Sequence, residues 1–159
     1  PLKCDNKKVT YTARNGKNIY ENRRNGMKDL MTVNVYLPQG RVLICGSCLE
    51  DTHPEGFAKL KAEADEVYAL CLEQTHINMA ITKIAAMLGT GRVTALNFAS
   101  VDRSPHCTQL HYIKHEIERT MKLDIPVKSY VVPDEEPIFV SDEAIDLSKS
   151  LSKLAEIKP

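Results

Sequence analysis

Apolar residues change their spacing several times along the chain, and each spacing predicts a different element. Three runs have the composition of buried strands: residues 41–45, 92–101 and 126–132. Segments with apolar residues at helical spacing lie between and after them: residues 54–88, 108–121 and 141–157. This alternation favours a mostly parallel sheet with helices packed on its faces. We therefore predict an α/β fold of the three-layer type, whose core spans residues 41–157.

The longest helical pattern begins at Pro54 and runs to Leu88, with an interruption near Thr75. Proline suits the first turn of a helix, because the N–H that it lacks would have no partner there. The second half of the pattern, NMAITKIAAML, is apolar on most faces. A helix that is apolar all round is typically buried, so we expect this half to be an interior helix.

The first 40 residues have a different pattern, in which short β-prone runs are separated by turn signals. Asn15-Gly16 and Asn25-Gly26 favour tight hairpins, because both residue types tolerate a positive φ. Residues 30–37 have the pattern of a further strand, in which valines alternate with polar residues. We predict that residues 1–40 form an antiparallel hairpin or meander extension, and that residues 1–159 form a single domain.

Composition narrows the class of protein. The 159 residues are 43% apolar, so the chain can bury a core of its own. The 21 basic and 21 acidic residues balance, whereas proteins that bind nucleic acids or membrane surfaces show a one-sided charge. We therefore expect no nucleic-acid partner.

The hydropathy of the chain also bears on its location. No apolar run approaches the roughly 18 residues that a membrane span requires, and the chain does not open on a signal-peptide pattern. We expect no membrane contact and a cytoplasmic location. Thiols stay reduced in that compartment, so the five cysteines are better explained as ligands, redox groups or core residues than as structural disulfides.

Two cysteine-bearing segments follow strands of the predicted sheet. The CGSC segment (residues 45–48) ends the strand over 41–45, and the SPHC segment (residues 104–107) follows the strand over 92–101. Parallel strands place their carboxyl ends at one edge of a sheet, where ligands of open α/β sheets bind. If these two strands are neighbours, both segments open into the same crevice.

The first hypothesis for this crevice is a metal ion or an iron–sulfur cluster, with zinc or iron as the metal. A Cys-x-x-Cys turn can direct two thiolates at one ion, and the remaining ligands then come from elsewhere in the chain. The candidate ligands are Cys45, Cys48, His53, His106 and Cys107. Short CxxC turns that follow a first strand also occur in the small subunits of hydrogenases, but the other cysteines of that family are missing here.

The second hypothesis is dithiol redox or sulfur-relay chemistry, with Cys45 and Cys48 as nucleophile and resolving thiol and a redox protein as partner. A helix downstream of such a motif can lower the pKa of one thiol. The stretch VLICGSCL is similar to a strand-ending Cys-Gly-Thr-Cys stretch of some sulfur-relay proteins, and its CxxC resembles that of thioredoxin. It departs from thioredoxin because no Trp precedes the motif and the predicted helix begins only at Pro54.

The third hypothesis is a non-catalytic module that binds a small molecule or assembles with other chains. Asp102, Arg103 and Ser104 combine a charge pair and a hydroxyl at a strand end, a suitable place to bind a small anion or nucleotide. In the metal hypothesis, Asp102 and Arg103 would instead orient the ligands and balance their charge. The interior-like helix and the N-terminal extension could form the interface of a homo-oligomer, here a homodimer.

Three other residues carry simpler interpretations. Cys71 falls at an apolar position of the predicted helix, so we expect it to pack in the core. His111 and His115 are four residues apart and share one face of a predicted helix, which is the spacing of a zinc-binding pair. A solvated helical face is the more common reason for such spacing.

Overall fold

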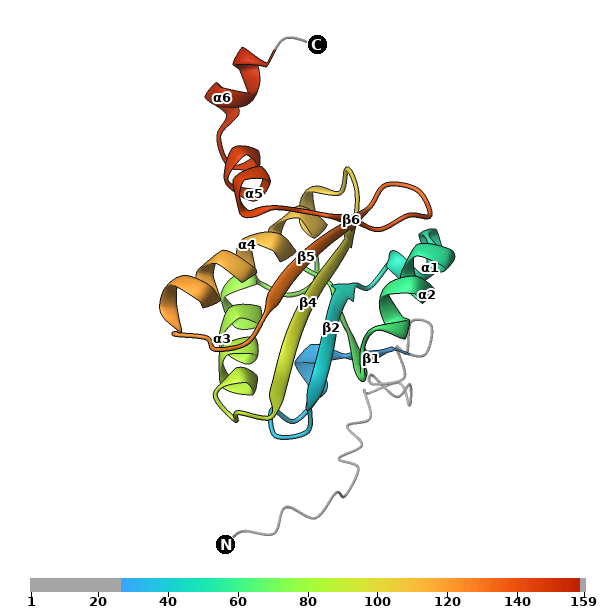
Figure 1. Cartoon of the computed structure of the whole chain (residues 1–159), viewed down its shortest axis with the longest axis vertical. Coiled ribbons are helices and arrows are strands. Elements are labelled where there is room, and N and C mark those ends of the chain that lie inside the picture. The colour runs from blue at the N-terminus through green and yellow to red at the C-terminus, as the bar shows by residue number, and fades with distance from the viewer. Residues whose placement is uncertain (1–26, 158–159) are drawn as a thin grey trace, which may run out of the picture.

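The computed structural model describes residues 27–157, and within that range the strands form one six-stranded sheet in the order β1-β3-β2-β4-β5-β6 (Figure 1). The strands are β1 (Lys28–Asp29), β2 (Gly40–Gly46), β3 (Glu66–Leu70), β4 (Val93–Val101), β5 (Val127–Val132) and β6 (Ile138–Phe139). Strands β1 to β5 pair in parallel, and β6 pairs antiparallel with β5. The mostly parallel sheet predicted from the sequence is confirmed.

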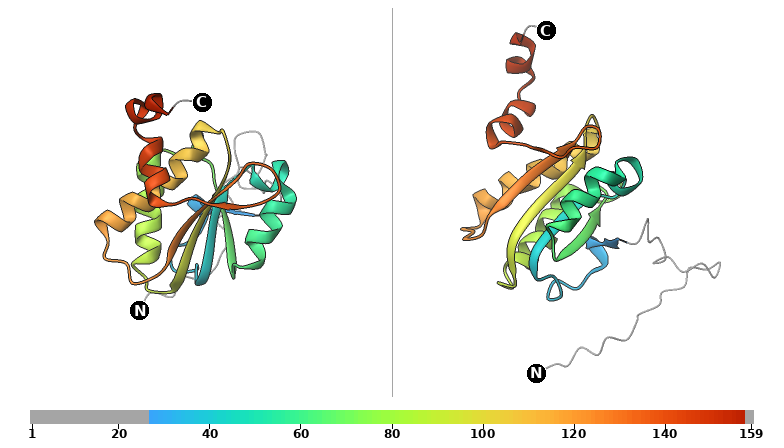
Figure 2. Two further views of the ribbon diagram at one scale, coloured as in Figure 1. Left: turned by 45° about the horizontal axis from the view of Figure 1, so that its top comes forward. Right: turned by 45° about the vertical axis from the view of Figure 1, so that its right-hand side comes forward.

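Helices cover both faces of this sheet (Figures 1 and 2). They are α1 (Leu49–Thr52), α2 (Pro54–Ala62), α3 (Ile77–Leu88), α4 (Pro105–Thr120), α5 (Asp142–Ser148) and α6 (Leu151–Glu156). Helices α1 and α2 lie on one face, and α3 and α4 lie on the other. Each face has its own buried apolar cluster, so the domain has the three layers that the sequence predicted.

Strand β2 is buried on both faces and contributes alternate residues to the two clusters. Leu43 and Cys45 pack with Phe57 of α2, whereas Ile44 packs with Ile84 of α3 on the opposite face. Successive side chains of a strand point to opposite faces, which accounts for this division. The side chain of Cys45 therefore lies in the apolar layer under α2.

The predicted helix over residues 54–88 is wrong in its middle, where the structure has strand β3 between α2 and α3. The segment Glu66–Leu70 pairs with β2 on one side and β1 on the other. Tyr68 is 1% exposed, and Asp65 just before the strand bonds the guanidinium and the backbone N–H of Arg41. Apolar residues that pack on both faces of a short central strand also fit a helical spacing, and tertiary pairing decides between the two.

The predicted strand over residues 30–37 is also wrong. Its first turn is a 3₁₀ helix, η1 (Leu30–Thr32), which begins where the Asp29 carboxylate accepts a hydrogen bond from the backbone N–H of Met31. Leu30 is fully buried in the cluster under α3 and α4. The two Asn-Gly hairpins proposed for the N-terminal extension lie outside the described residues.

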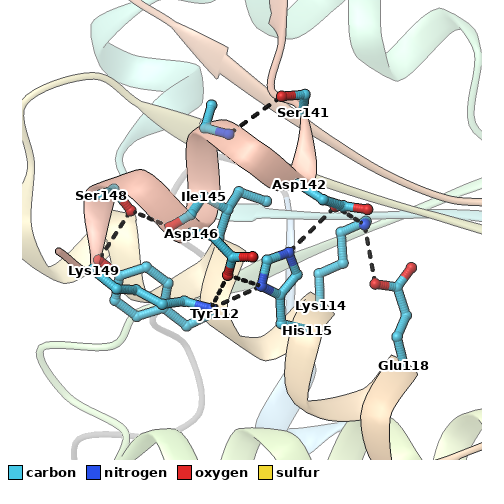
Figure 3. A network of polar contacts seen from close by, with 11 residues as sticks. Tyr112, Lys114, His115, Glu118, Ser141, Asp142, Ile145, Asp146, Ser148 and Lys149 are labelled. Atoms are coloured by element: carbon cyan, nitrogen blue, oxygen red, sulfur yellow. Dashed lines mark hydrogen bonds and ion pairs between the residues drawn. The ribbon is translucent and has the colours of Figure 1, made fainter. Parts of the chain in front are cut away.

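The C-terminal segment contains more elements than the single helix predicted over residues 141–157. Strand β6 precedes it, and the helix is divided into α5 and α6, of which α6 extends away from the sheet (Figures 1 and 2). Lys114 and His115 of α4 bond carboxylates of α5 and hold that helix against α4 (Figure 3). Among residues 27–157, no helix has the length and apolar character needed to cross a bilayer.

Candidate dithiol site at the carboxyl end of the sheet

The candidate site lies where the chain connections of two neighbouring strands diverge. Strands β2 and β4 are adjacent and parallel. From β2 the chain continues to β3 on one side of the pair, and from β4 it continues to β5 on the other side. Such a divergence leaves a crevice beyond the carboxyl ends of the two strands, and ligands of open α/β sheets bind there.

A pocket of about 100 Å³ occupies this crevice. Its lining comes from the segments that follow β2, β3 and β4: Gly46, Ser47, Cys48, Leu70, Cys71, Leu72, Glu73, Ser104, His106, Cys107 and Leu110. Three of the four cysteines that the structure describes are in this lining, namely Cys48, Cys71 and Cys107. The CGSC and SPHC segments therefore meet at one pocket, although 59 residues separate Cys48 from Cys107.

Two sulfur atoms are in contact across the two segments. The Sγ atoms of Cys48 and Cys107 are 4.0 Å apart. A Cβ atom at Gly46 would lie 3.0 Å from the Cys107 sulfur and 4.0 Å from the Cys48 sulfur. A larger residue at position 46 would crowd the Cys107 sulfur, so Gly46 leaves room for that sulfur.

Cys107 lies in the first turn of α4, and not in a loop as the sequence suggested. Ser104 caps this helix, because its Oγ accepts a hydrogen bond from the backbone N–H of Cys107 at 3.3 Å. Pro105 occupies the first helical position, where its missing N–H costs nothing. The helix N-terminus favours a negative charge, which suits a thiolate at Cys107.

The pKa values of the two thiols are shifted in opposite directions. A hydrogen bond from Cys48 lowers the pKa of Cys107 to about 6, although partial burial works against the charge. The Ser104 hydroxyl, a backbone N–H and the nearby His106 contribute to the same lowering. The pKa of Cys48 is raised in return, because its proton is held in the bond to Cys107 and the thiol is partly buried. The pair therefore shares one proton, with the charge placed at Cys107.

Cys45, the first cysteine of CGSC, has a different environment. It is fully buried, and its Sγ lies 3.4 Å from the Met27 sulfur and 3.6 Å from the Tyr68 carbonyl oxygen. Burial raises the pKa of Cys45 to about 12. The residue does not contribute to the pocket lining. The two cysteines of the CxxC turn are thus divided between the core and the pocket.

The other predicted metal ligands also separate. His106 lines the pocket and is exposed, whereas His53 ends α1 with its Nδ1 2.9 Å from the Thr52 hydroxyl and lies outside the lining. Within residues 27–157, no group of three or more His, Cys, Asp or Glu side chains is arranged to hold a metal ion. The predicted set of five ligands is therefore not gathered around one point, and the metal cofactor stays a prediction.

The three residues predicted to bind an anion lie in different surroundings. Ser104 caps α4 and lines the sulfur pocket. Arg103 has a φ of 59° and a side chain that is 94% exposed, with its Nε 3.9 Å from the Asp102 carboxylate. Asp102 lines a second, separate pocket between β4, β5, α4 and α5. They do not converge on one ligand position.

Cys71 is a pocket residue that the sequence interpretation missed. It was expected in the core of a helix, but it follows the end of β3 directly and is half-buried in the pocket lining. The short run Glu-Val-Tyr-Ala-Leu after Asp65 was the available signal, since valine and tyrosine favour strands. With that strand recognised, Cys71 would have been placed at the same sheet edge as Cys48.

Comparison of the sequence with known protein families agrees with the α/β fold. A profile of the Rossmann-like domain matches residues 35–157, which is most of the chain and includes the whole sulfur pocket. The chain belongs to this family. No curated protein sequence and no solved structure gives a significant match to the chain.

Proposed function

We propose that the protein is a thiol–disulfide exchange protein whose redox centre is the pair Cys48 and Cys107. The observation that carries this proposal is the 4.0 Å separation of the two sulfurs inside a pocket at the carboxyl edge of the sheet. A disulfide requires about 2.05 Å between the sulfurs, so a small movement of either side chain closes the bond. Cys107 serves as the nucleophile and Cys48 as the resolving thiol.

The exchange begins with the Cys107 thiolate, which attacks one sulfur of a substrate disulfide. The substrate S–S bond breaks, one substrate thiolate leaves, and Cys107 carries a mixed disulfide. Cys48 then loses its proton to the departing thiolate and attacks the Cys107 sulfur. The second substrate thiolate leaves and takes up the proton that Cys107 had released. The substrate gains two electrons and two protons, and the pair becomes a disulfide.

The local environment of Cys107 supports this division of roles. The lowered pKa of Cys107 leaves it ionised at neutral pH, which is the reactive form of a thiol. The Ser104 hydroxyl and the N-terminus of α4 also stabilise its negative charge. Cys48 stays protonated until the mixed disulfide removes the charge on Cys107, since the two thiols share one proton. The order of the two steps follows from this coupling.

This proposal changes the partner that the sequence suggested for Cys48. In the CxxC interpretation Cys45 was that partner, but its sulfur is enclosed by Met27 and Tyr68 in the apolar layer under α2. A bond between Cys45 and Cys48 would require Cys45 to leave its core position. Cys107 is already in contact with Cys48 and needs no such rearrangement.

A redox titration of the full chain tests the proposal. Protein carrying Cys4→Ser, which leaves only the four described cysteines, is equilibrated in glutathione buffers of rising disulfide content, quenched with acid and alkylated. Mass spectrometry should show two thiols lost together in one step. Cys48→Ser and Cys107→Ser should abolish that step, and Cys71→Ser should retain it as the matched control from the same pocket. A pair that stays reduced throughout, or a step that depends on Cys71, would overturn the proposal.

Metal analysis of anaerobically purified protein tests the alternative from the sequence. The dithiol proposal expects substoichiometric zinc and iron. One equivalent of either metal that is lost in both Cys48→Ser and Cys107→Ser would contradict the proposal and support a metal centre instead. A protein with neither metal nor an oxidisable pair would contradict both and favour the binding-module hypothesis.

A further inference from the structure

Helix α6 carries an apolar side that the described part of the chain leaves exposed. Leu151 and Leu154 of α6, and Ile157 directly after it, recur every three residues and are 80%, 38% and 57% exposed. None of the residues of α6 is buried, and the helix extends away from the sheet (Figures 1 and 2). A helix of six residues is not stable by itself in water, so α6 needs a surface to pack against.

A second exposed apolar surface lies on the α2 side of the sheet, at β5 and β6. Val132 at the end of β5 packs in the cluster under α2, and alternation along the strand places Tyr130 and Lys128 on the same side. Phe139 of β6 pairs with Tyr130, and the two rings meet edge to face with their centroids 6.0 Å apart. Phe139 is 58% exposed, and Lys128 is exposed as well. Lys128, Tyr130 and Phe139 thus form an open face beside the part of the sheet that α1 and α2 cover (Figures 1 and 2).

Helix α6 cannot reach the open face of its own chain while α5 keeps its place. The open face is on the α2 side of the sheet, whereas Lys114 and His115 anchor α5 to α4 on the opposite side (Figure 3). Only Lys149 and Ser150 join α5 to α6. Two residues span at most about 7 Å, which is less than the roughly 10 Å between packed layers of secondary structure. The surface that α6 needs must therefore belong to another molecule.

The charges of α6 and of the open face are complementary. Helix α6 carries an exposed base, Lys153, and an exposed acid, Glu156, one turn later. The open face has Lys128 near the start of β5, and the exposed Asp134 follows the end of that strand. A helix that runs antiparallel to β5 directs Lys153 toward Asp134 and Glu156 toward Lys128. Opposite charges at both ends favour this one direction of the helix.

The exposed area fits a reciprocal contact between two copies. Leu151, Leu154, Ile157 and Phe139 together expose roughly 400 Å² in each copy. Two such contacts remove roughly 800 Å² of apolar surface from water, and the polar residues around them bring the total to the order of 1,000 Å² that a specific interface requires. An exchange in which each copy gives one helix and receives one closes with twofold symmetry, and it leaves neither surface open.

We propose that a second copy of this chain covers the open face, with α6 of each copy packed antiparallel to β5 of the other. The sequence predicted a homodimer that uses its interior-like helix and its N-terminal extension. This proposal places the interface elsewhere, because α3 buries Ala80, Ile84 and Met87 in its own core. The exchange does not depend on the dithiol chemistry, and it takes place with all thiols reduced.

Sedimentation equilibrium of the reduced full chain, over a hundredfold range of micromolar concentrations, tests the proposal. We expect a monomer–dimer equilibrium. Leu151→Asp disrupts the apolar side of α6 and Phe139→Ser disrupts the open face, so each should raise the Kd of the dimer at least about tenfold. Met79→Asp changes a side chain of α3 that is 60% exposed and should leave the Kd unchanged. Circular dichroism of the three variants confirms that each one is folded.

A mixture of Leu151→Asp and Phe139→Ser distinguishes this exchange from other dimers. The first variant keeps an intact open face and the second keeps an intact α6, so one complete contact can form between unlike chains. The other contact carries both substitutions, but a contact that is already lost cannot be lost again. The mixture should therefore dimerise more strongly than either variant alone.

Three results would overturn the proposal. A chain that stays monomeric at every concentration would show that something other than a second copy covers the open face. A dimer that Phe139→Ser leaves intact would show that α6 pairs with a different surface, such as α6 of the second copy. Equal weakening by Met79→Asp, or a mixture no stronger than its components, would show that the two copies do not exchange their C-terminal helices.

Discussion

Cys45 and Cys48 belong to one four-residue motif, yet they occupy two regions with opposite properties. Cys45 points into the apolar layer under α2, where burial raises its pKa to about 12. Cys48 follows the end of β2 and lines the pocket, 4.0 Å from the sulfur of Cys107. The spacing of a CxxC motif therefore does not decide whether its thiols act together. The point at which the strand ends, and the face to which each side chain belongs, decide it.

The largest expected difference between the two regions is in thiol reactivity. Alkylation of Cys107 by iodoacetamide should rise as the pH passes about 6 and level off above it, because the lowered pKa makes the thiolate available early. Cys45 should react at least about a thousandfold more slowly at pH 7, since it is both buried and protonated. Residue-resolved mass spectrometry measures both rates. Equal alkylation rates of Cys107 and Cys45 in the native protein would contradict this difference between the two regions. In urea, where the protein is unfolded, the two cysteines should react at equal rates, which is the control.

The next expected difference is in stability. Cys45→Ser buries a hydroxyl in an apolar layer and should lower the free energy of unfolding by about 1–3 kcal/mol. Cys48→Ser replaces a half-buried pocket residue and should change that free energy by less than about 0.5 kcal/mol. Urea unfolding of the reduced variants gives both values. A larger loss in Cys48→Ser would mean that Cys48, and not Cys45, supports the core.

A smaller effect should follow from crowding the sulfur pair. In Gly46→Ala the new methyl group would lie 3.0 Å from the Cys107 sulfur, which must move by a few tenths of an ångström. We expect a loss of about 1 kcal/mol in the free energy of unfolding, together with slower alkylation of Cys107. Unchanged alkylation would show that the two sulfurs are less tightly placed than the account requires. Gly91→Ala is unsuitable as a control because Gly91 has a φ of 70°.

The smallest effect is expected at the third sulfur of the pocket. Cys71 is half-buried and has no sulfur contact as close as the one between Cys48 and Cys107 in the described chain. Cys71→Ser should change the free energy of unfolding by less than about 0.5 kcal/mol and leave the alkylation profile of Cys107 in place. A shift in the pH dependence of Cys107 alkylation would show that Cys71 also interacts with the charge shared by Cys48 and Cys107.

Much of the framework of this site could be predicted from the sequence, because β2, β4 and β5 are short runs of buried character with clear ends. We expected CGSC and SPHC to meet at one edge if β2 and β4 were parallel neighbours, and the structure places Cys48 and Cys107 there. The partner of Cys48 could not be predicted from the sequence. The identity of that partner depends on which side chain at the end of β2 is the last one to face the core. In β2 that residue is Cys45.

The errors have a common physical origin. The helical spacing before Cys71 concealed β3, whose pairing with β1 and β2 is a tertiary effect that no local pattern encodes. The same holds for His111, which was expected on a solvated helical face but is 6% exposed. Its hydrogen bond to Ser100 depends on how α4 packs on the sheet.

Peptide mapping of the oxidised protein under non-reducing conditions shows directly whether Cys48 and Cys107 form the redox pair. After equilibration with excess oxidised glutathione and removal of small thiols, the Cys4→Ser protein is digested at acid pH to prevent disulfide exchange. We expect one cross-linked peptide pair that joins Cys48 to Cys107, with Cys45 recovered as a free thiol. A link between Cys45 and Cys48, or no link at Cys107, would contradict this expectation.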